Sequence, residues 1–390
     1  MSKSSLLARG LTLYAALAAV AAAVLAPAAR AAAPIPQPPP VTARAYILGD
    51  YHSGRVLAAD HAYDRMEPAS LTKLMTSYVV FRALKEGRLK LTDSVTISEH
   101  AWRSEGSRTF VQVGTQIPAE VLIKGMIVQS GNDATIALAE RVGGTEDGFA
   151  QIMNEYAKQL GLTGSHFANS DGLPNPEHYS TARDMFVIAQ ALIRDFPEYY
   201  PIYATKEFRY NNISQPNRNR LLGTDPTVDG VKSGHTEAAG WCLIASAKHG
   251  ERRLVAVVLG AKSDAARAQE AERLLNWGFA AFDTVQLYQP GKPLATLRVW
   301  KGAQREVKAG FLADRYLTLP KGKADKLALT AQAQEPLIAP IASAQTLGTV
   351  KVSLEGKPIA EFPLIALEEV PEGNFFSRTW DTVRLRFEKK

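Results

Sequence analysis

Three short patterns place serine, lysine and asparagine side chains at spacings that suit nucleophilic catalysis. Residues 70–73 read Ser-Leu-Thr-Lys, residues 130–132 read Ser-Gly-Asn, and residues 232–234 read Lys-Ser-Gly. Each pattern is weak alone, because composition predicts an S-x-x-K about once in a chain of this length. Here each pattern occurs once. Together they indicate an acyl-transfer site built from three distant segments.

The first pattern is predicted to supply the nucleophile and its base. At the start of a helix, the Ser70 hydroxyl lies near backbone N–H groups and a dipole that favour a developing oxyanion. Lys73 follows one turn later on the same face. A buried lysine near a second cation such as Lys232 loses its proton readily, so neutral Lys73 could deprotonate Ser70. The alternative is a helix-capping serine with a solvated lysine.

The other two patterns are predicted to handle the substrate. Ser130 could pass a proton to the leaving amine, and Asn132 could hold a substrate amide; the alternative is an ordinary helix cap. Lys232 and Ser233 could meet a terminal carboxylate at a strand edge. Gly234 would let an extended peptide approach that edge. Taken alone, Lys-Ser-Gly is most often a turn.

The elements that must position these residues predict an α+β fold. Helices are expected over 70–86, 118–128, 133–142, 147–160, 181–194 and 265–282, and strands over 45–50, 55–59, 241–247 and 254–259. Strands from both ends of this region would form an antiparallel sheet with helices against it. This first domain is expected to span 45–290. Alternating runs with Gly and Pro turns predict a small all-β domain over 291–371.

Both ends of the chain suggest export. Basic residues, the apolar run 11–25 and an Ala-Arg-Ala pattern at 29–31 predict a secretory signal peptide over 1–31; the alternative is a transmembrane anchor. Residues 32–44 read as a Pro-rich linker. Residues 372–390 predict an amphipathic helix, apolar on one face and basic on the other, that lies on a membrane; the alternative is a helix packed on the β domain.

Composition excludes several classes of function. Without residues 1–31 the net charge falls from +6 to about +3, and no basic patch with interleaved aromatics predicts a nucleic-acid partner. The lone cysteine, Cys242, excludes an intrachain disulfide and reads as a small buried hydrophobe. No dense cluster of His, Cys and Asp suggests a metal, and no cofactor is expected.

These patterns resemble the D-alanyl-D-alanine carboxypeptidases of the low-molecular-mass penicillin-binding proteins, whose pattern set they match. The similar segments are 68–77 (PASLTKLMTS), 130–134 (SGNDA), 229–235 (DGVKSGH), 274–279 (LLNWGF) and 372–381 (EGNFFSRTWD). The resemblance implies a transpeptidase/β-lactamase-like domain followed by a β-sandwich-like domain. It also implies that Arg267 helps to bind the substrate carboxylate.

The resemblance further implies removal of the terminal D-alanine from the peptidoglycan stem pentapeptide through an acyl-enzyme on Ser70, and acylation by β-lactams. The protein is then expected in the periplasm, on the inner-membrane surface through its C-terminal helix. A DD-endopeptidase, a β-lactamase and a non-catalytic morphogenesis protein remain alternatives. Two features depart from the family: Ser233 stands where threonine is usual, and the charged tail is shorter than the longest anchors.

Overall fold

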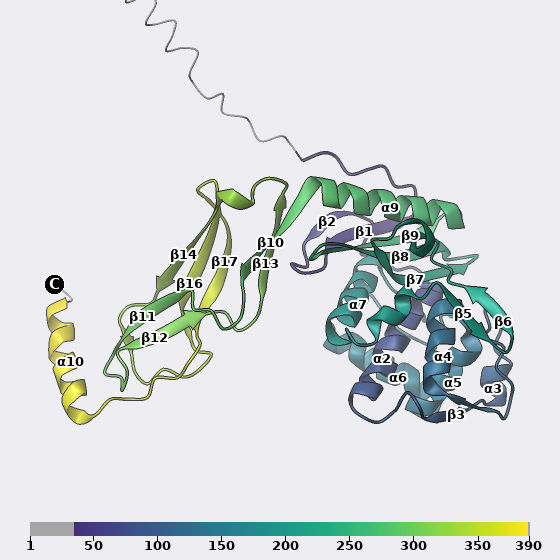
Figure 1. The fold of residues 1–390 in the computed structure, drawn as a ribbon, viewed down its shortest axis with the longest axis horizontal. Coiled ribbons are helices and arrows are strands. Elements are labelled where there is room, and N and C mark those ends of the chain that lie inside the picture. Colours follow the sequence, from purple (N-terminus) through teal and green to yellow (C-terminus); the bar gives the residue numbers. More distant parts are fainter. Residues whose placement is uncertain (1–34, 389–390) are drawn as a thin grey trace, which may run out of the picture. The chain divides into compact units, whose positions relative to one another are not determined.

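The computed structural model describes residues 35–388. The predicted signal peptide at 1–31 and the first residues of the linker therefore lie outside the described residues. Residues 35–37 have no regular secondary structure, and a compact body begins at Pro38. Within that body, the three sequence patterns all fall before residue 282, and a β-rich region follows them (Figure 1).

The first region is built on a five-stranded antiparallel sheet, as predicted. Its strand order, β2-β1-β9-β8-β7, joins the first two strands to the last three (Figure 1). The strands are β1 (Ala45–Asp50), β2 (Val56–Asp60), β7 (Val228–Thr236), β8 (Gly240–His249) and β9 (Arg252–Ala261).

Strand β9 is buried on both faces, which explains its unbroken apolar run. Val255, Val257 and Leu259 pack in the core formed with the helices of the middle of the chain. Leu254 and Val258 face the opposite way, into the core formed with α9 (Asp264–Ala281). The sheet is thus covered by helices on both faces, and β7 remains as an edge strand beside the site.

Helices supply most of the remaining core. On α2, the side chains at positions 74, 75, 78 and 79 are buried, because this spacing places them on one face of the helix. The longer helices are α2 (Lys73–Lys85), α5 (Asn132–Gly143), α6 (Glu146–Gln159), α7 (Ala182–Asp195) and α9. The short ones are η1 (Ala69–Thr72), α3 (Glu99–Trp102), α4 (Ala119–Lys124), η2 (Gly125–Gln129), η3 (Tyr200–Ala204) and α8 (Leu221–Thr224).

Two predicted helices depart from plain α-geometry next to the motifs. The helix expected from Ser70 begins as the tight turn η1 and becomes α-helical only at Lys73. The helix expected over 118–128 ends in the wide turn η2, after which Ser130 is left-handed with φ 67°. Such local irregularities concentrate at functional sites because they aim particular side chains. Two small antiparallel pairs, β3 (Ser94–Thr96) with β4 (Gln116–Pro118) and β5 (Glu207–Tyr210) with β6 (Ile213–Pro216), complete this region.

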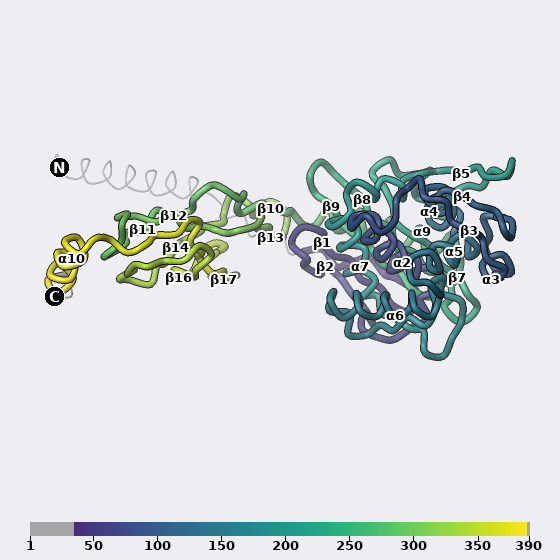
Figure 2. Tube along the Cα trace, turned by 90° about the horizontal axis from the view of Figure 1, so that it is seen from below, coloured from purple at the N-terminus to yellow at the C-terminus, as the bar shows by residue number. Residues whose placement is uncertain are grey.

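The C-terminal region is all-β up to its last helix, as predicted, with its own core (Figure 2). Strand pairing here begins at Phe282, before the predicted boundary at 291. One two-stranded sheet pairs β10 (Phe282–Tyr288) with β13 (Arg315–Pro320). A second sheet has the order β14-β16-β17-β12-β11-β15, from β11 (Ala295–Trp300), β12 (Glu306–Gly310), β14 (Leu327–Ala333), β15 (Leu337–Ile338), β16 (Thr346–Leu354) and β17 (Lys357–Ala366), with the short turn η4 (Ala324–Lys326) before β14.

The last element is helix α10 (Phe375–Glu388), where the sequence predicted an amphipathic helix. Five large apolar side chains are exposed on it, and Phe376 is 82% accessible. They are Phe375, Phe376, Trp380, Val383 and Phe387. Over residues 35–388, no helix combines the length and apolar character needed to cross a membrane.

Candidate active site

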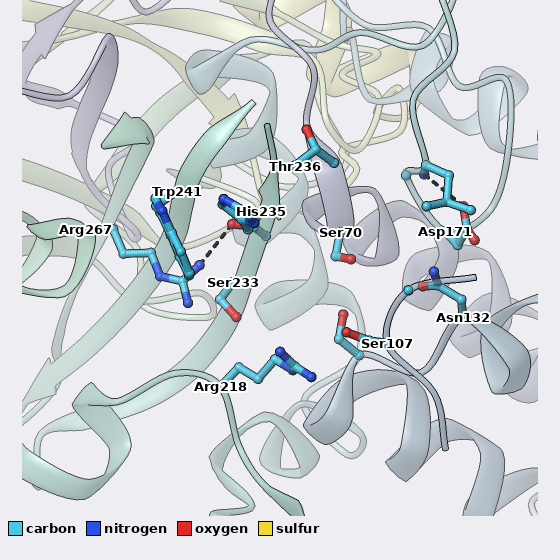
Figure 3. Close-up of a pocket in the computed structure, with 15 residues that line it drawn as sticks. Ser70, Ser107, Asn132, Asp171, Arg218, Ser233, His235, Thr236, Trp241 and Arg267 are labelled. Atoms are coloured by element: carbon cyan, nitrogen blue, oxygen red, sulfur yellow. Dashed lines mark hydrogen bonds between the residues drawn. The ribbon is translucent and has the colours of Figure 1, made fainter. Parts of the chain in front are cut away.

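The three sequence patterns converge on one pocket of about 210 Å³ (Figure 3). Six of the eight predicted site residues line it directly: Ser70, Ser130, Asn132, Ser233, Gly234 and Arg267. The remaining two, Lys73 and Lys232, are nearly fully buried and hydrogen-bond the serines that line it. The helical segment η1–α2, the turn between η2 and α5, and strand β7 therefore meet at a single site.

The Ser70–Lys73 pair has the geometry of a nucleophile and its base. Lys73 Nζ lies 3.1 Å from Ser70 Oγ. The same nitrogen donates to Asn132 Oδ1 and to the Asp171 carbonyl, both at 2.7 Å. These acceptors fix Nζ beside the hydroxyl. The one-turn spacing places both side chains on one face, as the sequence predicted.

Burial prepares Lys73 to accept a proton. Its side chain is 1% exposed, and this loss of hydration lowers the pKa of Lys73 to about 8. The negative charges of Asp171, Glu146 and Asp133 oppose that shift. A lysine with a pKa near 8 is partly neutral under ordinary conditions, and only neutral lysine can act as a base.

A second lysine and serine form a parallel arrangement across the pocket. Lys232 Nζ donates to Ser130 Oγ at 3.0 Å and to the carbonyl of Ser233 at 2.8 Å. Burial lowers the pKa of Lys232 well below its usual value, and the positive charges of Lys73, Arg218 and Arg267 lower it further. Ser130 therefore bonds to a polarising amine while its hydroxyl faces the pocket.

A buried carboxylate shapes the turn that carries Ser130 and Asn132. Asp133 is fully buried and accepts from the backbone N–H groups of four residues, at 2.7–3.2 Å. They are Thr109, Phe110, Val111 and Ala134. Asn132 also donates to the Glu105 carbonyl at 2.6 Å. The left-handed backbone at Ser130 is held by this network of bonds.

Gly234 is needed for the approach of two protein segments. A Cβ at this position would lie 3.1 Å from the backbone nitrogen of Ser70 and 3.2 Å from that of Leu71. The sequence predicts that the missing side chain makes room for substrate. In the structure, its absence lets strand β7 lie directly against the turn that carries Ser70.

Arg267 lines the pocket, but its terminal nitrogens bind the protein itself. Nη1 donates to the carbonyls of Gly234 at 2.9 Å and Cys242 at 3.1 Å, while Nη2 pairs with Asp264. The guanidinium also lies 5.0 Å from the ring centre of Trp241. Arg267 thus braces β7 and β8 at the edge of the pocket, and its role as a carboxylate ligand stays a prediction. Cys242 is fully buried, as predicted.

Sequence reasoning missed Arg218. It lines the pocket, and its Nε donates to the Gln129 carbonyl at 3.3 Å. Within residues 35–388, neither Nη atom of Arg218 has a hydrogen-bond or ion-pair partner. Figure 3 shows its guanidinium below Ser233. No motif marks an isolated arginine in the segment 217–220, so only the fold identifies it.

Asp171 was also missed. Its side chain lines the pocket and is 2% exposed, yet within the described part of the chain Oδ2 has no hydrogen-bond partner. Burial raises the pKa of Asp171, against the opposing effect of Lys73.

Several buried contacts fix the loop that carries Asp171. Glu146 accepts from the backbone and the hydroxyl of Ser170. His178, whose pKa burial lowers to about 4, is neutral and bonds Thr72 at 2.7 Å. A Cβ at Gly172, where φ is 87°, would overlap the Ala69 carbonyl. The loop is therefore fixed against the turn η1, which carries Ser70.

The arrangement matches known protein families over most of the chain. Residues 32–263 match the family model described as D-alanyl-D-alanine carboxypeptidase, and residues 282–372 match that of the penicillin-binding protein 5 C-terminal domain. The chain belongs to the D-alanyl-D-alanine carboxypeptidase family. It is a hydrolase with a D-Ala-D-Ala carboxypeptidase activity, and a penicillin-binding protein by fold.

Individual relatives agree with this assignment. The chain is 48% identical over 372 residues to D-alanyl-D-alanine carboxypeptidase DacC of Escherichia coli (strain K12), covering 93% of each chain. Penicillin binding protein 5 from Haemophilus influenzae has a similar structure, with a TM-score of 0.83 and 44% identity over 86% of this chain and all of that one. An ampicillin-bound penicillin-binding protein D2 from Listeria monocytogenes is 28% identical, with a TM-score of 0.58, over 62% of this chain and all of that one.

Proposed function

We propose that this carboxypeptidase removes the terminal D-alanine of the peptidoglycan stem pentapeptide with Ser70 as nucleophile and Lys73 as general base. One observation carries the assignment: Lys73 Nζ, fully buried and with a lowered pKa, lies 3.1 Å from Ser70 Oγ. A serine hydroxyl is a weak nucleophile until a neighbouring base takes its proton.

In the acylation step, Ser70 Oγ attacks the carbonyl carbon of the penultimate D-alanine while Lys73 Nζ takes the hydroxyl proton. The positive N-terminal end of the helical segment η1–α2, which carries Ser70, favours the negative charge that develops on the carbonyl oxygen. As the C–N bond breaks, the leaving amine takes a proton from Ser130, whose hydroxyl bonds to Lys232. The proton that Lys73 took from Ser70 passes to Ser130, so that Ser130 is a hydroxyl and Lys73 a neutral amine again before the second step. D-Alanine leaves, and an ester on Ser70 remains.

In the second step, water adds to the ester carbonyl and regenerates Ser70. Lys73 is the group placed to accept the proton of that water, because its Nζ lies beside the oxygen that leaves. The chain's own side chains supply every proton transfer in this scheme.

Substrate binding is assigned to the β7 end of the pocket. Asn132 presents an amide beside the nucleophile, while Ser233 and Lys232 present a hydroxyl and an amine for the terminal carboxylate. Arg267 and Arg218 add positive charge at the same end. Charge-assisted bonds of this kind bind a free C-terminal carboxylate more strongly than a neutral end.

The direct test is to incubate the purified mature protein with a pentapeptide ending in D-Ala-D-Ala and to assay free D-alanine. We expect release by the wild type and none by Ser70→Ala. Ser107→Ala is the matched control, since this serine lines the same pocket without belonging to the three patterns. Equal release by Ser70→Ala and wild type would remove Ser70 as the nucleophile.

The same serine is proposed to be acylated by β-lactams. A penicillin places a strained amide and a carboxylate where the substrate has its scissile bond and C-terminus. An ampicillin-bound relative supports this proposal. Mass spectrometry should find the penicilloyl adduct on the peptide that contains Ser70. An intact protein mass that stays unchanged with excess penicillin would contradict it.

Helix α10 is proposed to bind the inner-membrane surface. Its exposed aromatic side chains and the arginines Arg378, Arg384 and Arg386 support this role. The full chain should co-sediment with vesicles of phosphatidylethanolamine and phosphatidylglycerol, and a chain ending at residue 372 should remain in solution. Equal sedimentation of both chains would refute the proposal.

Export to the periplasm is the matching proposal for the N-terminus. It rests on the signal-peptide pattern of residues 1–31. N-terminal sequencing of protein from a periplasmic extract should begin near Ala32. A full-length protein confined to the cytoplasm would contradict export.

A further inference from the structure

The residues just before strand β1 are bound to the catalytic region. Val41 and Ala43 pack against the core that α9 forms with the sheet. The backbone nitrogen and the hydroxyl of Thr42 both donate to Glu270 Oε1, at 2.9 and 2.7 Å, and Glu270 is 2% exposed on α9. The end of the predicted linker is therefore fixed in place, and so is the backbone from which the Arg44 side chain extends.

The Arg44 side chain reaches from this segment to the turn between β7 and β8, which residues 237–239 form. Its Nη2 donates to the carbonyls of Ala238 and Ala239, at 2.7 and 2.5 Å. On the way it crosses Gly260, near the end of β9, where a Cβ would overlap the Nε atom of Arg44. A single side chain thus joins the segment before β1 to a turn that lies far away in the sequence.

This turn connects two parts of the pocket wall. His235 and Thr236, at the end of β7, and Trp241, near the start of β8, line the pocket that contains Ser70 (Figure 3). The ring centres of His235 and Trp241 lie 4.0 Å apart, so the two strands pack against each other beside the pocket. A shift of the turn would therefore move lining residues on both sides of it.

A chain of hydrogen bonds connects Arg44 to the segment before Ser70. Ala239 is fully buried; its carbonyl accepts from Arg44, and its N–H donates to Thr236 Oγ1 at 3.0 Å. The Thr236 hydroxyl in turn donates to Glu67 Oε2 at 3.3 Å. Glu67 precedes Ser70 closely in the sequence. The turn is thus held from two sides, and loss of Arg44 would remove one of them.

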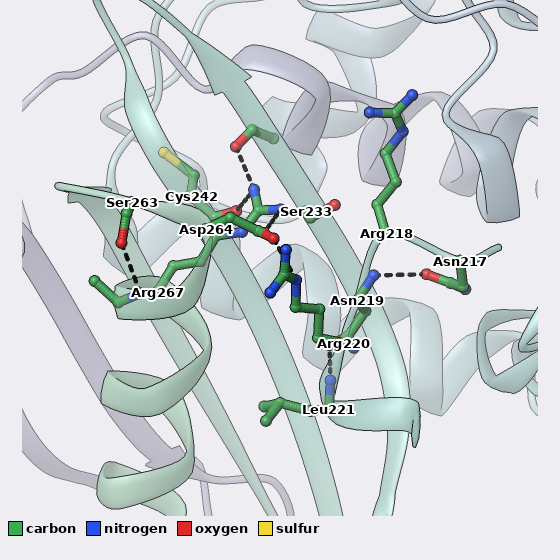
Figure 4. A network of polar contacts seen from close by, with 12 residues as sticks. Asn217, Arg218, Asn219, Arg220, Leu221, Ser233, Cys242, Ser263, Asp264 and Arg267 are labelled. Carbon is green, nitrogen blue, oxygen red and sulfur yellow. Dashed lines mark hydrogen bonds and ion pairs between the residues drawn. The ribbon is translucent and has the colours of Figure 1, made fainter. Parts of the chain in front are cut away.

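Arg267 holds the same pair of strands at a different place. It reaches them from α9 (Figure 4), and its Nη1 donates to the carbonyls of Gly234 and Cys242. These bonds fix the strands, whereas those of Arg44 fix the turn that joins them. Hydrogen bonds from a charged donor are roughly twice as strong as neutral ones. Two guanidinium groups from distant segments therefore set the position of one wall of the pocket.

We propose that Arg44 is a positioning residue of the carboxypeptidase, which holds the turn between β7 and β8 so that Thr236 and Trp241 stay in place beside the substrate's terminal carboxylate. This inference rests on the proposed assignment of that carboxylate to the β7 end of the pocket. Arg44 itself does not line the pocket. Its effect should therefore fall on substrate binding and not on the proton transfers at Ser70 and Lys73.

The experiment measures kcat and KM separately for D-alanine release from a soluble pentapeptide ending in D-Ala-D-Ala, with the purified mature protein. Arg44→Gln removes the charge, and Arg44→Lys keeps a charged donor on a side chain of similar length. Arg183→Gln is the matched control, because this arginine donates to the Gly161 carbonyl at 2.7 Å and does not line the pocket. The melting temperature of each variant reports the stability of its fold.

We expect Arg44→Gln to raise KM about three- to tenfold and to leave kcat within about twofold of the wild type, as the loss of charge-assisted bonds at an exposed position implies. Arg44→Lys should recover part of the loss, and Arg183→Gln should keep the wild-type KM even if its melting temperature falls. This split separates positioning from stability, because a smaller fraction of folded enzyme lowers the apparent kcat without changing KM.

A double-mutant cycle tests the path through Ala239. Thr236→Val removes the hydroxyl that joins the Ala239 N–H to Glu67. If Arg44 and Thr236 hold the same turn, the KM of the double variant should differ more than about twofold from the product of the two single effects. A KM equal to that product would show that the two residues act independently, and would refute the path.

Other results would overturn the inference. An unchanged KM in Arg44→Gln, or an equal rise in Arg183→Gln, refutes Arg44 as a positioning residue while the proposed function stands. A fall in kcat that follows the melting temperature, with KM unchanged, assigns Arg44 to stability alone and refutes the inference as well. A wild type that releases no D-alanine refutes the proposed function, and the inference with it.

Discussion

Charged side chains are usually exposed and large apolar side chains are usually buried. The active-site pocket departs from this pattern by burying charged side chains, and helix α10 departs from it by exposing apolar ones. In the pocket, Lys73 and Lys232 are at most 3% exposed. On α10, Phe375, Phe376 and Phe387 are at least 76% exposed. A buried amine costs free energy unless it is hydrogen-bonded, and an exposed aromatic group forgoes the gain of burial.

The difference between the two regions lies in where the compensation comes from. Each buried amine donates hydrogen bonds to acceptors inside the protein, and these bonds offset the free-energy cost of its burial. Within the described residues, the aromatic side chains of α10 stay largely exposed, so no part of the fold offsets the cost of their exposure. The folded protein itself stabilises the two buried amines, whereas the aromatic face of α10 would be buried only against a second surface.

Replacing the buried base should have the largest effect. We expect Lys73→Met to lower kcat/KM for D-alanine release by at least about a thousandfold, since general-base catalysis contributes roughly 10²–10⁴ and positioning of Ser70 is lost as well. Lys85→Met, at an exposed position of the same helix, should behave as the wild type. Near-normal turnover in Lys73→Met, with circular dichroism unchanged, would assign the base elsewhere.

On α10, a charge placed among the aromatic side chains should chiefly alter membrane binding. Trp380→Glu should lower the vesicle partition coefficient about 10–100-fold, because about 1.5–3 kcal/mol of apolar burial is lost. Hydrolysis of a soluble pentapeptide should not change, since α10 lines no part of the pocket. Thr382→Glu adds the same charge without removing an aromatic ring and should lose less. An equal loss in both variants would mean that charge alone governs binding.

The pH profile tests the electrostatics of the pocket. Lys73 must be neutral to act as a base, so kcat/KM should rise with pH through about 8 and level off above it. Asp171 opposes the lowering of that pKa, and Asp171→Asn should therefore move the rising limb toward lower pH. Asp147→Asn, exposed at the start of α6, is the matched control. A rising limb that stays in place or moves to higher pH in Asp171→Asn would mean that the limb does not report the titration of Lys73.

The smallest effect is expected at the unusual serine of the third pattern. Ser233→Thr keeps the hydroxyl and adds one methyl group at a nearly buried position of β7. We expect kcat/KM for D-alanine release to change by less than about threefold. Ser233→Ala, which removes the hydroxyl, should lose more. A severe loss in Ser233→Thr would show that the pocket is fitted to serine.

Local periodicity was enough to predict much of this fold. The helix over 70–86 and the strands over 241–247 and 254–259 followed from the periodicity of the apolar residues, because that periodicity depends on neighbours in sequence. The same holds for the pairing of Ser70 with Lys73, which one helical turn dictates. The exact form of the turns did not follow, since η1 and the left-handed Ser130 are held by contacts with distant segments.

The sequence by itself determined which residues are able to do chemistry, because the three patterns fix the residue types and their local spacing. Only the tertiary structure decided the depth at which Lys73 and Lys232 are buried, and with it the pKa that makes a lysine a base. It alone brought Arg218 and Asp171 to the pocket, and it placed Arg44 against the turn between β7 and β8. Burial and charge proximity depend on segments that are far apart in the chain, and no local pattern records them.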